Sequence, residues 1–146
     1  MKKSKRISAF IAAVVMVVTM FTSAVPAFAA EPVIKMGTDS YGSNIITGYR
    51  SAVSNTQMSA RTKSNKKASR IATTIITRTV DSKGNLVKPA RNKDLGKDNA
   101  TDSGIATVTS GSGNHFEYIY IMCAAVYDNN DNHCAAVPFT YEFWIW

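Results

Sequence analysis

The chain has little cysteine and little histidine, with two residues of each among 146. Two cysteines are too few for a disulfide-dense mini-protein and for a four-cysteine zinc site. The sequence also lacks a heptad repeat, and it has no second apolar run of membrane length beyond the one near its start. The residues that follow this apolar run are enough for one modest hydrophobic core and too few for two.

The first 29 residues are typical of a secretion signal of bacterial type. Lysines and an arginine open the chain, residues 9–21 form an uncharged apolar run, and the small residues Ala27 and Ala29 fit a signal peptidase pocket. We therefore predict cleavage after Ala29 and a secreted, extracellular protein. The alternative is an uncleaved membrane anchor, because no charge occurs between Arg6 and Glu31.

Charge is segregated along the mature sequence. All 13 basic residues that follow the signal lie between Lys35 and Lys97, whereas residues 98–146 hold six acids and no lysine or arginine. In one interpretation the basic part binds an anionic cell-envelope polymer. In the other, neighbouring strands of one sheet carry complementary charges. The candidate anion-binding residues are Arg61, Lys63, Lys66, Lys67, Arg70 and Arg78. We do not expect nucleic acid as a partner, because no aromatic residues interleave with these bases.

Alternation and composition predict strands along most of the mature chain. Residues 55–63 alternate with period two, and residues 68–80 are rich in isoleucine and threonine, which pack well on a pleated surface. Residues 115–127 and 139–146 are also strongly β-forming. Because no segment of the mature chain shows a 3.6-residue period, we predict an all-β protein, a single small β-sandwich of antiparallel strands, with a barrel as the alternative.

Polar and glycine-containing segments divide these strands. We predict a flexible arm over residues 30–43, a turn at residues 64–67, a hairpin turn at residues 81–85 and a flexible loop over residues 91–104. The β-sandwich domain is therefore expected over residues 44–146.

Aromatic residues gather at the end of the chain, where nine of the 11 in the mature sequence lie between Phe116 and Trp146. Strict alternation places Phe116, Tyr118, Tyr120 and Met122 on one face of a strand whose other face is also apolar, so we expect a central strand covered on both sides. Most of these aromatic residues then belong to the core. Trp144 and Trp146 are the candidates for an exposed aromatic platform that binds sugar rings.

The two cysteines open a repeated segment, Cys-Ala-Ala-Val, that starts at Cys123 and again at Cys134. In an exported chain with two cysteines, we expect a disulfide between them. The polar stretch between them is centred on Asn130 and not midway between the cysteines, so the bridge requires a bulge or a diagonal pairing. The alternative is a pair of buried thiols.

No catalytic constellation emerges from the sequence. Ser112 lies near His115, but a nucleophile elbow needs a following helix, and none is expected here. The carboxylates are scattered, no two of them form an evident acid–base pair, and no glycine-rich loop precedes a helix that could bind phosphate. We therefore expect a non-catalytic protein with no cofactor and no metal site.

Three short segments, Lys67-Ala68-Ser69, Ser103-Gly104-Ile105-Ala106-Thr107 and Phe143-Trp144, are similar to stretches of the lactococcin-972-like secreted bacteriocins. Those proteins have a signal peptide and a small all-β mature chain, and the present chain is longer and has two cysteines. The principal hypothesis is a secreted, non-catalytic binding or structural protein whose partner is an anionic cell-envelope polymer or a carbohydrate. The resemblance implies the alternative, a secreted antimicrobial protein.

Overall fold

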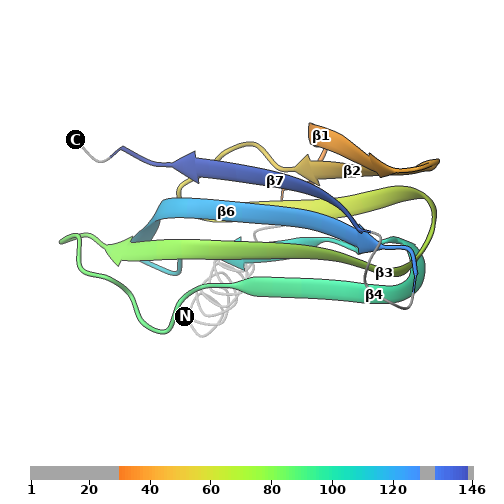
Figure 1. Cartoon of the computed structure of the whole chain (residues 1–146). Coiled ribbons are helices and arrows are strands. Elements are labelled where there is room, and N and C mark those ends of the chain that lie inside the picture. The colour runs from red at the N-terminus through yellow and green to blue at the C-terminus, as the bar shows by residue number, and fades with distance from the viewer. Residues whose placement is uncertain (1–29, 129–133, 145–146) are drawn as a thin grey trace, which may run out of the picture.

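The computed structural model describes residues 30–128 and 134–144. The all-β prediction is confirmed, because these residues form one antiparallel sheet and contain no helix (Figure 1). The strands are β1 (Ile34–Tyr41), β2 (Asn44–Arg50), β3 (Gln57–Asp81), β4 (Lys93–Asp102), β5 (Ala106–Thr109), β6 (Asn114–Val126) and β7 (Cys134–Glu142). No helix able to cross a membrane occurs in this described part of the chain. The predicted signal peptide and Trp146 lie outside it.

The long strand β3 organises the sheet. Its first half pairs with β2 along one edge and with β5 along the other, and its second half pairs with β6 and β4 in the same way. The two halves face each other, since the hydroxyls of Thr62 and Thr73 share a hydrogen bond of 2.6 Å. The sheet is therefore nearly closed and barrel-like. The two separate sheets of a sandwich are not confirmed, because β3 belongs to both halves.

A bulge explains how β3 changes direction. Lys63 pairs with Asp102 of β4, but Ala68 pairs with Ala100, so β3 has three more residues than its neighbour over this interval. Residues on the bulged side of a pair bend the strand and increase its twist. The predicted turn at residues 64–67 is therefore wrong, because these residues remain in β3.

β1 closes the sheet against β7, so the prediction of a flexible arm over residues 30–43 is wrong. The two strands lie side by side, and the backbone N–H of Ala136 donates to Oδ2 of Asp39 at 2.8 Å. Pro138, two residues further along β7, faces β1 in the same way but has no N–H to donate. Between β1 and β7, a side-chain carboxylate therefore accepts a hydrogen bond that a backbone carbonyl would accept in a regular pair of strands.

The predicted flexible loop over residues 91–104 is also wrong in its central part, which forms β4. This strand has no apolar face because only Leu95 and Ala100 reach the core. Within the described residues β4 pairs only with β3, so its second edge is open. Alternating lysine and aspartate residues on such an edge oppose pairing with another chain.

The core lies inside the curled sheet, between the facing halves. Phe116, Ile119 and Ile121 of β6 are fully buried, as are the isoleucines of β2 and β3 that meet them. β6 lies between β3 and β7, which confirms it as a central strand. Its outer face is only half-buried, however, so the expectation that both faces are covered is not met.

The predicted disulfide is wrong. In the register of β6 and β7, Cys123 pairs with Val137 and Cys134 pairs with Val126, so the two cysteines lie on opposite faces of the sheet. No bond joins them. Cys123 points into the core, where burial raises the pKa of its thiol, and Cys134 is exposed.

Candidate functional site

A second bulge, in β6, forms the floor of the candidate site. Arg78 of β3 pairs with Tyr118, but the next residue, Thr79, pairs with Phe116, so Glu117 is the extra residue. Phe116 turns into the core, and its N–H donates to the carbonyl of Asn55 at 2.6 Å. Bulges re-aim side chains in this way. Glu117 thereby meets Arg78, with its Oε2 at 2.5 Å from the guanidinium Nε.

The neighbouring strands complete the site. Tyr118 lies between Arg78 on β3 and Glu142 on β7, so these three residues form one row across the outer face of the sheet. β7 ends at Glu142, and the chain stays against β6 because the N–H of Phe143 donates to the carbonyl of Glu117 at 2.9 Å. The next residue, Trp144, lines the same pocket as this row.

These residues enclose a shallow pocket on the outer face, with a volume of about 620 Å³. Its lining consists of Arg78, Glu117, Tyr118, Glu142, Phe143 and Trp144. The Trp144 side chain is 78% exposed, which is unusual for so large an apolar group. The ring of Phe143 contacts the ring of Tyr141 edge to face, at 4.9 Å between ring centroids.

The pocket carries a net negative charge. Arg78 forms an ion pair with Glu117, and no ion pair engages Glu142 among the described residues. The Oε2 atom of Glu117 is buried and is the atom that forms the ion pair with Arg78. The pocket thus offers the carboxylate of Glu142 beside an exposed aromatic ring.

The structure brings two of the sequence-predicted site residues, Arg78 and Trp144, into this one pocket. Trp146, the second member of the predicted aromatic platform, lies outside the described residues. Glu117 and Glu142 were not expected as binding residues. Glu142 shares the parity of Trp144, which was a signal for it, but the bulge that redirects Glu117 leaves no mark in the alternation pattern.

The other predicted anion-binding residues do not form a free cationic patch, because the arginines are paired with acids. Arg61 holds Asp102 through two hydrogen bonds of 2.8 Å from Nε and a further contact from its terminal nitrogen. Arg70 lies 3.7 Å from Asp98, also on β4. These pairs match the interpretation in which neighbouring strands carry complementary charges.

The lysines of the cluster lie where β3 bends. Lys63 lies over the ring of Tyr49, at 5.8 Å from the centroid, and the ammonium of Lys66 donates to the hydroxyl of Ser43 at 2.7 Å. Lys67 is exposed. Without the predicted turn, these lysines are not gathered with Arg70 and Arg78 at a hairpin tip.

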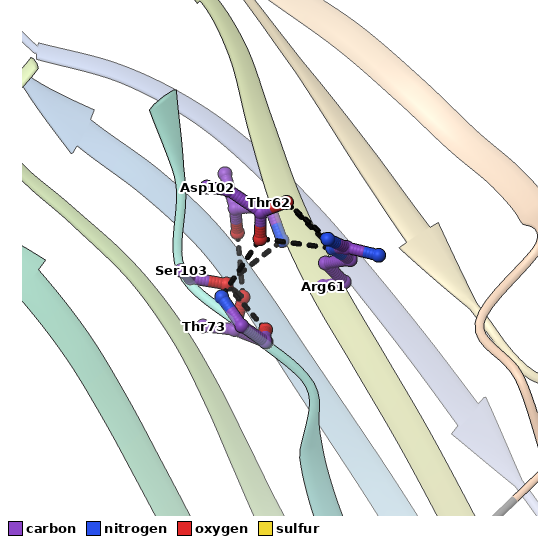
Figure 2. Close-up of polar contacts among 6 residues, drawn as sticks. Arg61, Thr62, Thr73, Asp102 and Ser103 are labelled. Atoms are coloured by element: carbon purple, nitrogen blue, oxygen red, sulfur yellow. Dashed lines mark hydrogen bonds and ion pairs between the residues drawn. The ribbon is translucent and has the colours of Figure 1, made fainter. Parts of the chain in front are cut away.

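Beside the Arg61–Asp102 pair lies a buried group of hydroxyls (Figure 2). The Thr73 hydroxyl shares hydrogen bonds with the hydroxyls of Thr62, at 2.6 Å, and Ser103, at 2.8 Å. The Ser103 oxygen also accepts the backbone N–H of Thr62 at 3.1 Å. Every member has a partner, so this group joins the two halves of β3 to the chain between β4 and β5 and has no free hydroxyl for chemistry.

Replacement of Thr73 with valine is expected to lower the free energy of unfolding by about 1–2 kcal/mol, because it leaves buried hydroxyls with fewer partners. Equilibrium unfolding in urea measures the change. Thr74→Val is the matched control, since Thr74 faces outward and its hydroxyl bonds the exposed Asp94. A smaller loss in Thr73→Val than in Thr74→Val would contradict the structural role of the hydroxyl group.

Comparison with known proteins finds no matching family model, no curated relative and no solved structure with significant similarity. The resemblance to secreted bacteriocins therefore depends on the three short segments alone. In the structure, Ser103 belongs to the buried hydroxyl group and Lys67-Ala68-Ser69 lies within β3, whereas Phe143-Trp144 lines the pocket.

Proposed function

We propose that the chain is a secreted, non-catalytic binding protein that holds a carbohydrate in the pocket around Trp144. The observation that supports this proposal most directly is an exposed tryptophan at a pocket whose other walls carry carboxylates, a guanidinium and a phenol. Ligand sites typically combine aromatic surface with a few polar groups that fix orientation. A sugar ring can use both the aromatic surface and the polar groups, because its C–H face packs on an indole while its hydroxyls form hydrogen bonds with the polar groups.

A carbohydrate suits this site better than a polyanion does. The pocket holds two carboxylates against one guanidinium, which repels anions. Outside the pocket, Arg61 and Arg70 are engaged by aspartates. The hypothesis of an anionic cell-envelope polymer therefore gains less support from the geometry than the hypothesis of a sugar.

The arrangement favours binding over glycoside hydrolysis. Hydrolysis uses two carboxyl groups with different roles on opposite sides of the scissile bond. Glu117 is engaged by Arg78, which leaves Glu142 as the only unengaged carboxylate among the described residues of the pocket. Secretion, which the sequence of residues 1–29 predicts, would place the pocket outside the cell, where envelope polysaccharides are available.

The test is retention of the purified mature protein on insoluble cell-wall polysaccharide. Trp144→Ala is expected to weaken retention by about tenfold or more, since a central aromatic contact is worth more than 1.4 kcal/mol. Tyr41→Ala is the control, because Tyr41 is a half-exposed aromatic at the far end of β1. Equal retention of wild type and Trp144→Ala would refute the proposed site.

A further inference from the structure

We infer that the pocket selects a sugar bearing a free ammonium group, a deacetylated amino sugar, over its neutral N-acetylated form. This inference rests on the proposed function and adds the charge of the ligand to it. It follows from two features of the pocket: the charge left by the carboxylate of Glu142, which is unpaired among the described residues, and its aromatic faces.

The charge balance of the pocket calls for one cation. Arg78 and Glu117 neutralise each other as an ion pair, and Glu142 remains beside them with no ion pair in the described part of the chain. Glu142 lies directly across from Tyr118 on the outer face, so its carboxylate borders the pocket. A ligand ammonium group at this position completes the charge balance.

The carboxylate of Glu142 favours a strong donor. It has no ion pair within the described residues and lines the pocket, so its oxygens can accept hydrogen bonds from a ligand. An ammonium group has three donors and can reach more than one carboxylate oxygen. An acetamide group has one N–H and carries no charge, so it satisfies this acceptor less well.

The aromatic walls favour the same ligand. Trp144 is largely exposed and Tyr118 is half-buried, so ring surface remains available to a ligand. Cations are attracted to the faces of tryptophan and tyrosine. A protonated amino sugar therefore gains from the rings through its charge as well as through its apolar face, whereas a neutral sugar gains only through the latter.

Calorimetric titration of the mature protein with glucosamine oligomers and with N-acetylglucosamine oligomers of the same length tests the inference. We expect the glucosamine oligomer to bind about tenfold more tightly, and added salt to reduce that preference. Glu142→Gln should remove most of the preference, and Glu31→Gln, the same change in an exposed residue that does not line the pocket, should preserve it.

The outcomes separate the inference from the proposed function. Equal affinities for the two oligomers, both lost in Trp144→Ala, would overturn the inference and support the function. Tighter binding of the acetylated oligomer, or an unchanged preference in Glu142→Gln, would also overturn the inference. If neither oligomer binds the wild type and cell-wall polysaccharide does not retain it, both fail.

Discussion

Replacement of Phe116 with alanine is expected to lower the free energy of unfolding by about 3–5 kcal/mol, because it removes the largest fully buried side chain of the described residues and leaves a cavity. The matched control is Tyr118→Ala, two residues further along β6. Tyr118 lies on the half-exposed outer face, so its loss is expected to be about 1 kcal/mol. Urea unfolding at neutral pH measures both.

This pair of variants also tests the bulge at Glu117. Strict alternation, as expected from the sequence, gives Phe116 and Tyr118 the same face and therefore similar losses. The structure separates them by one extra residue, with Phe116 inside and Tyr118 outside. Similar losses in the two variants would contradict the bulge, and with it the position of Glu117 in the pocket.

Those elements with strong local signals could be predicted from the sequence. Alternation over residues 55–63 predicted a strand, and in β3 Met58, Ala60 and Thr62 are buried whereas Lys63 is exposed, although Ser59 is buried as well. The isoleucine- and threonine-rich residues 68–80 predicted a strand that the structure contains as the second half of β3. Gly84, with a φ of 81°, forms the expected turn that follows β3.

The remaining errors have a common physical cause, because a bulge changes alternation without a local signal. At residues 64–67 the polar sequence resembles a turn, but the chain stays in β3, where Ser64 pairs with Ile46 of β2 and the Asn65 side chain bonds the backbone of Ile45 and Ser43. At Glu117 one extra residue moves Phe116 to the core. The polar strand β4 was not predicted, because its backbone pairing with β3 stabilises it. Most of its side chains are exposed, so the sequence shows no apolar alternation there.

The segregated charges of the sequence acquire a structural meaning in the sheet. β3 carries Arg61, Arg70 and Arg78, and each forms an ion pair with an acid on the neighbouring β4 or β6. Since both acidic strands follow β3 in the sequence, the basic part and the acidic part of the chain pair directly. The charge pattern therefore describes contacts within the sheet before it describes any partner.

These ion pairs differ in burial, and the loss of the most buried one is the second change that we expect to reduce stability strongly. Asp102→Asn is expected to lower the free energy of unfolding by about 2–3 kcal/mol at neutral pH, because it removes a partly buried, charge-assisted contact with Arg61. Asp98→Asn is the control, since Arg70 and Asp98 are 60% and 71% exposed and 3.7 Å apart. Such exposed pairs contribute about 0–1 kcal/mol.

The effect of Asp102→Asn should also depend on pH. Partial burial raises the pKa of Asp102, but the hydrogen bonds from Arg61 and Gly104 and the charges of Arg61 and Lys63 outweigh it, so the pKa lies below its ordinary value. An acid whose pKa is lowered by folding stabilises the fold above its unfolded pKa of about 3.9 and loses this contribution as the pH falls through the folded value. The difference in stability between wild type and Asp102→Asn should therefore shrink below about pH 4. A difference that stays constant from pH 7 into the acid range, or that equals the difference for Asp98→Asn, would contradict the assigned role of the Arg61–Asp102 pair.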